Sequence, residues 1–228
     1  MRALVEIQDI SKIYNPGENE VRALDHISLT IQKGEFVAII GQSGSGKSTL
    51  MNMIGCLDVP TEGTYILNGQ NVSKLSDNEL SDIRNQEIGF IFQGFNLIAN
   101  LTAQENVELP LIYRGVPKKE RHELSVAALK KVGLAHRMDH RPSEMSGGQQ
   151  QRVAIARAIA QAPPVILADE PTGNLDSASS MEILDILKQL HAENRTVILI
   201  THDNDIAKQA KRVIRIKDGK IERDYENE

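Results

Sequence analysis

The stretch Gly41-Gln42-Ser43-Gly44-Ser45-Gly46-Lys47-Ser48-Thr49 decides the fold of this chain. It follows the apolar run 36–40, which predicts a buried strand, and it precedes a helix-competent segment that starts at Leu50. Glycines let a backbone fold closely around an anion, so that successive N–H groups point at phosphate oxygens. The helix that follows directs the positive end of its dipole at the same anion. The stretch therefore predicts a phosphate-binding loop for a nucleoside triphosphate.

Two side chains of this loop carry specific expectations. Lys47 is placed to reach the β- and γ-phosphates, and the Ser48 hydroxyl is a ligand for Mg²⁺. Glycine-rich turns are also common on protein surfaces, but a position between a buried strand and a helix favours nucleotide binding. The residues expected to contact the nucleotide are Gly41, Ser43, Gly44, Ser45, Gly46, Lys47, Ser48 and Thr49.

The composition is that of an ordinary folded protein. A chain of 228 residues can bury a substantial core, as one domain with a subdomain. The formal net charge of −5 argues against a nucleic-acid binder, which would normally carry a basic field. The single cysteine, Cys56, excludes an internal disulfide framework and fits a reducing compartment. We interpret it as a small apolar residue rather than a reactive thiol.

The sequence gives no signal for membrane insertion. The charged Arg2 and Glu6 leave no room for the apolar region of a signal peptide. No apolar run approaches the roughly 20 residues that a helix needs to span a bilayer, and runs such as 197–200 have the length of a strand. We therefore expect a soluble, cytoplasmic protein unless a partner holds it at a membrane.

The spacing of apolar residues changes twice along the chain. The first part alternates apolar and polar residues as half-buried strands do, and from about Leu101 to Ala162 the spacing is helical. Beyond Ala162 strands and a helix alternate, with β-branched runs that suit buried parallel strands. This layout predicts an α/β core interrupted by a helical insertion. The predicted strands are 4–10, 27–31, 64–67, 88–92, 165–168, 196–200, 213–216 and 220–221, and the predicted helices are 120–132, 149–161 and 181–193, with a loop at 15–19 and a hairpin turn at 218–219.

The strand 165–168 ends in two adjacent carboxylates, Asp169 and Glu170. Hydrolysis of a triphosphate needs a magnesium ligand and a water-activating group in addition to the phosphate loop. At the C-terminal edge of a parallel strand, Asp169 is expected to hold Mg²⁺ and Glu170 to accept a proton from the attacking water. The alternative is a solvated acidic pair at the start of a loop, but the preceding apolar strand favours the catalytic pair.

A second segment suited to an anion is Ser146-Gly147-Gly148-Gln149. A serine and two glycines immediately precede a predicted helix, so free N–H groups and a hydroxyl are presented to an anion. Taken alone, this segment is equally an ordinary helix N-cap.

Together, these three segments resemble the ATP-binding-cassette (ABC) ATPases, and the resemblance extends from about Val5 to Ile221. It implies an α/β fold: a P-loop NTPase core of ABC-ATPase type with an antiparallel β subdomain and an inserted α-helical subdomain. The implied catalytic core is 1–94 with 163–228, and the helical subdomain is about 95–162. The implied cofactors are ATP and Mg²⁺, and the implied activity is ATP hydrolysis.

The resemblance also assigns roles to single residues. Tyr14 stands where the family stacks an aromatic ring on adenine, Gln93 where a glutamine reaches Mg²⁺ and the attacking water, and His202 where a histidine contacts the γ-phosphate. Each alone would be read as structural, but their order along the chain supports the functional roles. Asp176 lies in the loop that crosses the dimer interface. The implied catalytic residues are Lys47, Gln93, Glu170 and His202, and the implied metal ligands are Ser48, Gln93 and Asp169. The nucleotide is expected to contact, besides the loop residues, Tyr14, Gln93, Ser146, Gly147, Gly148, Gln149 and Asp176.

Three further segments, 52–58, 92–98 and 105–111, look like the MacB/LolD group, whose ATPases serve macrolide and peptide exporters and lipoprotein-releasing systems. The departures from the usual family pattern are small: Gln42 replaces a proline, Gly94 a glutamine and Met145 a leucine. None of them removes a catalytic group, so we expect an active ATPase.

The resemblance implies partners. It predicts an ATP-dependent, head-to-tail homodimer in which Ser146-Gly147-Gly148 serves the ATP of the partner subunit. It also predicts a separately encoded integral-membrane permease of FtsX/MacB-like type that docks near 93–98 and the helical insertion, with a periplasmic or extracytoplasmic adaptor. The chain would then be cytoplasmic and attached peripherally to the inner face of the cell membrane. Phe95, Leu97 and Ile98 are interpreted as docking residues, with core packing as the alternative.

Three classes of function are compatible with such an ATPase. The leading one powers a membrane exporter or extruder of a peptide, drug or lipid-linked substrate. The second is an FtsE-like mechanotransmitting ATPase that regulates a membrane partner without transport. The third, a soluble ATPase acting on DNA or ribosomes, is disfavoured by the acidic charge and the lack of zinc-spaced cysteines. The first two share identical catalytic parts, so this sequence does not separate them.

Overall fold

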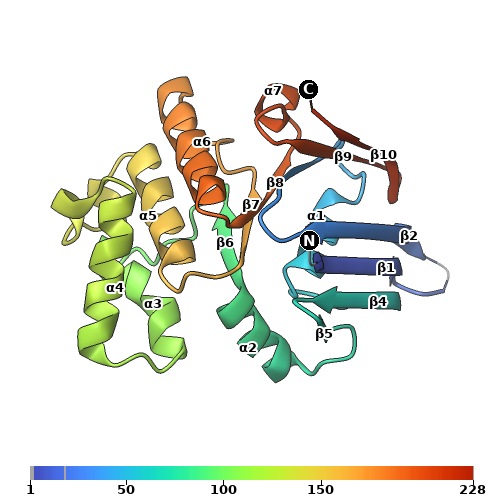
Figure 1. Ribbon diagram of the computed structural model, residues 1–228, viewed down its shortest axis with the longest axis horizontal. Helices are drawn as coiled ribbons and strands as arrows, with labels where there is room; N and C mark the ends of the chain where they lie inside the picture. The colour runs from blue at the N-terminus through green and yellow to red at the C-terminus, as the bar shows by residue number, and fades with distance from the viewer. Residues whose placement is uncertain (1–2, 18, 228) are drawn as a thin grey trace. The chain divides into compact units, whose positions relative to one another are not determined.

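The computed structural model describes residues 3–17 and 19–227. The chain divides into two compact units, Met1–Arg84 with Asn194–Glu228 and Asn85–Glu193. The segment 95–162, predicted as a helical insertion, lies within the second unit. Figure 1 shows helices α3, α4, α5 and α6 in this second unit. Each unit is described by itself.

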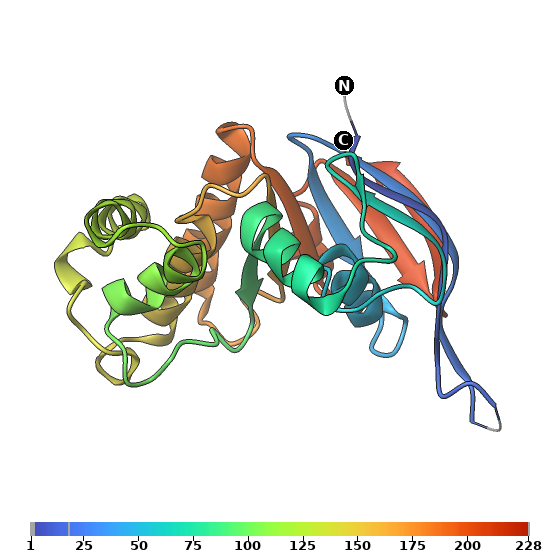
Figure 2. The ribbon, with the colours of Figure 1, turned by 90° about the horizontal axis from the view of Figure 1, so that it is seen from below.

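An antiparallel sheet in the first unit confirms the predicted β subdomain. Its strand order is β2-β1-β4-β5, and each strand runs antiparallel to its neighbours. Apolar side chains at alternate positions of β1 and β2, such as Ile7 and Leu29, are buried, as the alternating pattern predicted. The hairpin joining β1 to β2 projects from the unit, as Figure 2 shows. The bounds are β1 Ala3–Tyr14, β2 Val21–Gln32, β4 Glu62–Leu67 and β5 Gln70–Asn71.

A second set of strands in the first unit has the order β10-β9-β3-β8. The central strand β3 pairs in parallel with both β8 and β9, and all five of its residues are buried. Continuous apolar runs in β3 and β8 therefore reflect burial on both faces. The bounds are β3 Phe36–Ile40, β8 Thr196–Thr201, β9 Arg212–Lys217 and β10 Lys220–Glu226, with helices α1 Lys47–Ile54 and α7 Asn204–Ala207.

The second unit contains two parallel strands, β6 Ile88–Phe92 and β7 Val165–Asp169. Helices α3, α4 and α5 contact one another, and they lie side by side in Figures 1 and 2. Their bounds are α3 Ala103–Tyr113, α4 Lys118–Lys131 and α5 Gly147–Ile159, followed by α6 Ser177–Ala192, with short 3₁₀ turns at Ala135–Arg137 and Pro142–Glu144.

The structure adds a helix that the pattern did not predict and lengthens another. Helix α2 spans Asp77–Glu87, and because most of its residues are charged or polar and Leu80 is its one buried residue, few apolar positions mark it in the sequence. Helix α6 begins at Ser177 instead of the predicted 181, because Asp176 caps it and places four mostly polar residues in its first turn.

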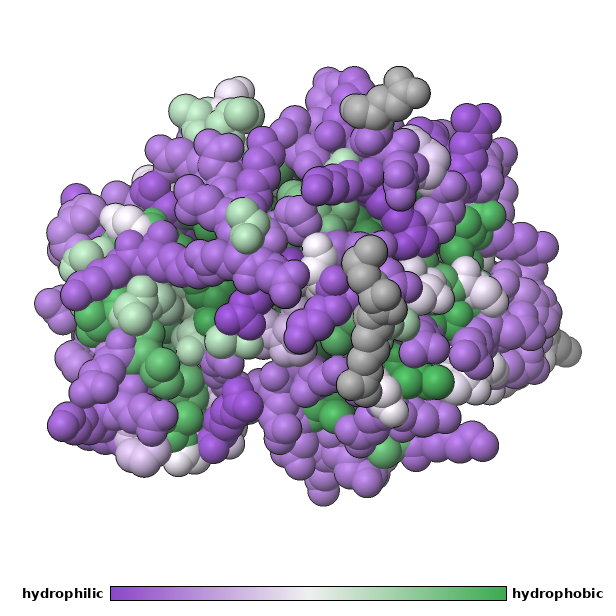
Figure 3. All heavy atoms as spheres, viewed as in Figure 1, coloured by the Kyte–Doolittle hydropathy of each residue, from purple (hydrophilic) through white to green (hydrophobic). Residues whose placement is uncertain are grey.

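In the described ranges, 3–17 and 19–227, no helix is long and apolar enough to cross a membrane. Hydrophilic residues cover most of the face seen in Figure 3, with hydrophobic residues in scattered groups among them.

Candidate nucleotide-binding site

The loop 41–49 adopts the backbone conformation that its glycines permit. Gly44 and Gly46 have φ values of 77° and 102°, in the left-handed region that other residues rarely enter. A Cβ on Gly46 would also lie 2.6 Å from the carbonyl oxygen of Ala23, so only glycine fits there. Gly46 caps α1, and its carbonyl oxygen accepts the Leu50 N–H at 2.9 Å. The loop thus passes directly into the first turn of a helix.

The charge and polarity of this loop fit a phosphate. The first turn of α1 contains no acidic residue, and its free N–H groups make the helix end electropositive. The Lys47 ammonium donates to the carbonyl oxygens of Gly41 at 2.6 Å and Gln42 at 2.7 Å, which holds its charge at the loop. The buried Ser45 Oγ has no protein partner among the described residues, so the loop retains an unused polar group. These residues fit the phosphates of ATP.

Tyr14 ends strand β1 and is held by two polar neighbours. Its hydroxyl donates to Asp58 Oδ2 at 3.2 Å, and Lys12 Nζ lies 5.2 Å from the centre of its ring. Lys12 in turn forms an ion pair with Asp58 at 2.6 Å. Burial, followed by the charge of Asp58, raises the pKa of the Tyr14 hydroxyl. The phenol is therefore neutral at ordinary pH, and its ring has a fixed place in the β subdomain.

His202 leaves the sheet beside the loop. Strands β3 and β8 are parallel with Ile40 opposite Thr201, so the next residues, Gly41 and His202, start at the same strand edge. The His202 side chain is exposed. The first unit thus brings together the phosphate loop and the predicted γ-phosphate histidine.

An equivalent register occurs in the second unit. Strands β6 and β7 are parallel with Phe92 opposite Asp169, so Gln93 and Glu170 leave adjacent strand ends together. Glu170 has a φ of 45°, a left-handed conformation that costs energy for a residue with a Cβ and that concentrates at functional sites. The structure therefore brings together the predicted metal ligand, general base and water-orienting glutamine of this unit.

The side chain of Gln93 is fixed by the loop that follows Glu170. Gln93 Nε2 donates to Asn174 Oδ1 at 3.1 Å, and Asn174 Nδ2 donates to the Gln93 carbonyl oxygen at 3.1 Å. A Cβ on Gly173 would lie 2.6 Å from Gln93 Nε2, so the glutamine packs directly against this glycine. Asn174 is a contact that sequence reasoning did not assign, because nothing local marks a pairing across 81 residues.

Ser146 and Asp176 are both helix N-caps. The Ser146 side chain accepts from the Gln149 N–H, and the Gln149 side chain accepts from the Ser146 N–H in return, which forms a capping box at the start of α5. Asp176 accepts from the backbone and hydroxyl of Ser179 at 2.9 and 2.7 Å, and these bonds hold its pKa below the ordinary value. A Cβ on Gly148 would lie 2.7 Å from Ser179 Oγ. The two caps thus meet where α5 packs on α6.

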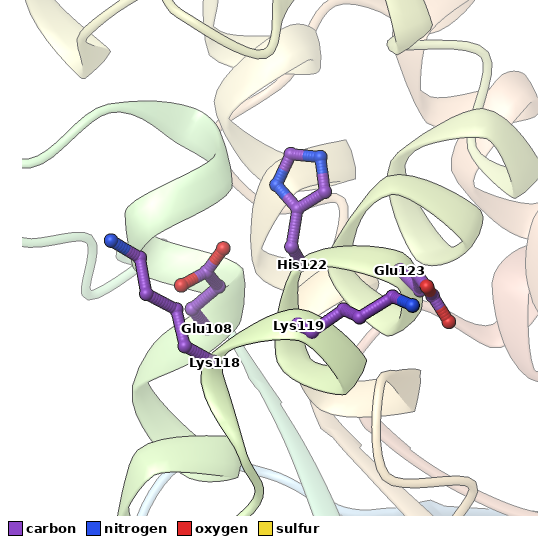
Figure 4. Close-up of a pocket in the computed structure, with 5 residues that line it drawn as sticks. All are labelled: Glu108, Lys118, Lys119, His122 and Glu123. Carbon is purple, nitrogen blue, oxygen red and sulfur yellow. The ribbon is translucent and has the colours of Figure 1, made fainter.

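A shallow hollow of about 570 Å³ lies elsewhere in the second unit, on helices α3 and α4. Its lining residues are Glu108 from α3 and Lys118, Lys119, His122 and Glu123 from α4, and Figure 4 shows Glu108 beside Lys118, with Lys119 and Glu123 pointing away from it. None of these lining residues is a predicted site residue. Glu108 is also already bound by Arg121 at 3.0 Å, so the hollow belongs to the packing of this helix pair.

The loop at the start of α1, with carboxylates at the end of a parallel strand, defines a P-loop nucleotide-binding protein. The chain belongs to the ABC transporter family, whose model matches residues 24–173. It is an ABC ATPase cassette that binds ATP, and the predicted fold and activity are thereby confirmed.

Relatives place the chain in the MacB/LolD group. It is 57% identical over 224 residues to the macrolide export ATP-binding/permease protein MacB of Hyphomonas neptunium. This match covers 98% of this chain and 35% of that protein. The chain thus spans about a third of that relative. It is 55% identical over 218 residues to the uncharacterized ABC transporter ATP-binding protein YvrO of Bacillus subtilis, covering 96% and 95% of the two chains.

A solved structure has the same fold. The dimeric post-hydrolysis state of the ATP-binding cassette MJ0796, bound to ADP and Pi, superposes with a TM-score of 0.90 and 47% sequence identity. The match covers 98% of this chain and 99% of that one. That cassette is therefore similar to this chain over nearly the whole length of both.

Proposed function

We propose that this cassette powers an integral-membrane permease of FtsX/MacB-like type, which exports or extrudes a peptide, drug or lipid-linked substrate. The support is the 57% identity to a protein named for macrolide export, in which ATP-binding and permease functions share one chain. In this proposal the cassette is attached to the inner face of the cell membrane through the permease, and a periplasmic or extracytoplasmic adaptor completes the export route.

The first unit has the groups for holding the nucleotide. Lys47 and the N–H groups of 44–48 neutralise the phosphates, and the Ser48 hydroxyl is a ligand for Mg²⁺. The Tyr14 ring stacks on adenine, with its orientation fixed by Asp58. His202 contacts the γ-phosphate from the neighbouring strand end.

The second unit has the groups for hydrolysis. The observation that carries this part is the register of Phe92 with Asp169, which starts Gln93 and Glu170 side by side. Asp169 would be a ligand for Mg²⁺, and the ion, when bound, would supply charge neutralisation for the phosphates. Gln93 orients the attacking water, and Glu170 takes its proton.

Two copies of the chain form a head-to-tail dimer in this proposal. The Ser146 hydroxyl and the N–H groups of Gly147, Gly148 and Gln149 form a capped helix start in α5, and such helix starts bind anions. They serve the ATP of the partner copy, with the loop before Asp176 at the interface. The dimeric state of the similar cassette MJ0796 supports this arrangement. Hydrolysis then loosens the pair, and the permease uses this motion.

The experiment is Glu170→Gln in the purified chain. We expect retained ATP binding, an ATPase rate lower by about 10² to 10⁴-fold because the general base is lost, and an ATP-bound dimer in light scattering. Glu123→Gln, an acidic residue of α4 in the hollow of Figure 4, is the matched control and should keep the wild-type rate. A fully active, monomeric Glu170→Gln protein would overturn the proposal.

The relatives do not favour the FtsE-like alternative, since the named ones are export proteins. Co-reconstitution with the permease separates the two functions. Movement of a substrate that depends on Glu170 supports export, whereas ATP-dependent activation of the membrane partner without substrate movement supports the alternative.

A further inference from the structure

The strand ends that carry Gln93 and Glu170 share a single buried amide. Gln151 lies in α5 and is fully buried. Its Nε2 donates to the carbonyl oxygen of Pro171 at 2.6 Å and to that of Phe92 at 3.3 Å. Phe92 directly precedes Gln93, and Pro171 directly follows Glu170. One side chain of α5 therefore ties together the backbones that present the two groups.

Arg157, six residues further along α5, holds the other side of the same loop. Its Nη2 donates to the carbonyl oxygen of Phe95 at 2.9 Å, and its Nη1 donates to that of Asn96 at 2.6 Å. The loop around Gln93 is thus anchored to α5 before and after the glutamine, over about 9 Å of helix rise.

The loop conformation that Arg157 binds is a strained one. Phe95 and Asn96 have φ values of 59° and 50°, and two consecutive left-handed residues with a Cβ need compensating contacts. Arg157 is half-buried, and this burial lowers the pKa of its guanidinium. A charged donor in such a place makes strong hydrogen bonds to the two carbonyl oxygens.

We infer that Arg157 is a positioning residue for Gln93: it holds the backbone of 95–96 in the left-handed conformation that directs the Gln93 side chain. The inference rests on the role proposed above for Gln93. Its consequence is that α5, whose first residues form the capped segment 146–149, also sets the geometry of the water-orienting glutamine. Loss of Arg157 should therefore affect hydrolysis rather than nucleotide binding.

The same helical part of the chain offers a matched control. Arg121 is half-buried, donates to the carbonyl oxygen of Val116 at 3.3 Å and pairs with Glu108 at 3.0 Å. It resembles Arg157 in chemistry, but its partners belong to α3 and the turn before α4. A purely structural contribution of a half-buried arginine would appear in both variants.

The experiment is a double-mutant cycle of Arg157→Met with Gln93→Ala, with Arg121→Met as the control and melting temperatures measured for all variants. Arg157→Met should lower kcat about 10-fold, since displacements below 1 Å cost less than about 10²-fold, and leave the KM for ATP within about 2-fold. Arg157→Lys, which keeps the charge without the planar fork, should recover part of kcat. Arg121→Met should lower the melting temperature without a comparable loss of kcat.

The cycle separates this inference from the proposed role of Gln93. In the Gln93→Ala background, Arg157→Met should change kcat by less than about 2-fold, because the group that it positions is gone. If Gln93→Ala itself has the wild-type rate, the proposed role of Gln93 fails. If Gln93→Ala is impaired but Arg157→Met lowers kcat equally in both backgrounds, the role of Gln93 stands and the positioning inference is overturned. An unchanged kcat for Arg157→Met alone also overturns it.

Discussion

Replacement of Gly148 by alanine tests whether the start of α5 is fixed by close packing on α6. A Cβ at this position would lie 2.9 Å from Ser179 Cβ and 2.7 Å from Ser179 Oγ. The hydroxyl can rotate only by giving up its bond to Asp176, and the Cβ of Ser179 is fixed by the helix backbone. Ordinary contact begins at 3.4 Å, so the helices must separate by about 0.5 Å.

The expected cost follows from this overlap. Overpacking of a tight contact costs about 1–3 kcal/mol, and alanine returns about 1 kcal/mol over glycine inside a helix. Gly148→Ala should therefore destabilise the chain by up to about 2 kcal/mol, which lowers the melting temperature by up to roughly 8 °C for a protein of this size. Since the shifted residues belong to the capped segment 146–149, the ATPase rate should fall as well.

Differential scanning calorimetry measures the effect, with Gly147→Ala as the matched control. A Cβ on Gly147 would meet its nearest atom, Leu175 Cδ2, at 3.4 Å, which is ordinary contact, so this variant should be at least as stable as wild type. Adding Ser179→Gly to Gly148→Ala removes both crowding atoms. The double variant should therefore be more stable, by at least about 0.5 kcal/mol of unfolding free energy, than the sum of the two single-variant effects predicts. A Gly148→Ala protein as stable as Gly147→Ala, or strictly additive variants, would refute the packing argument.

Four further outcomes are expected. Lys47→Ala should weaken ATP binding in a calorimetric titration, since it removes the cation of the phosphate loop; unchanged affinity would contradict its role. His202→Ala should lower turnover more than affinity, and a near-normal ATPase rate would remove it from the mechanism. Burial raises the pKa of Cys56 from 9.0 to about 12, so the folded chain should resist iodoacetamide at pH 8.5 while the chain in urea reacts; equal rates would show that the thiol is accessible. The pKa of the Cys56 thiol is higher in the folded chain than in the unfolded chain, so burial of the neutral thiol contributes its full stability below about pH 9. This contribution is lost as the pH rises toward 12, and the unfolding free energy measured in urea should be lower at pH 11 than at pH 8.

The sequence by itself determined the features whose physical basis is local. Glycines at 44 and 46 permit a left-handed backbone wherever they occur, and a buried strand before them with a helix after them is visible in the pattern. The carboxylates at the end of β7 and the helix N-cap at Ser146 are likewise local, and the structure has both; it adds the capping box with Gln149 and starts α5 at Gly147 instead of the predicted 149. The dimer, the permease and the roles of the site residues stay predictions.

Only the tertiary structure decided which backbone holds each of these groups. Helix α2 was not predicted because its residues are mostly charged or polar and it buries only Leu80. The contacts of Gln93 with Asn174, and of Arg157 with Phe95, join residues 81 and 62 positions apart, and no propensity or spacing records such pairs. They arise because parallel register and helix packing bring strand ends and α5 together, so the residues that position the chemistry appear only once the chain has folded.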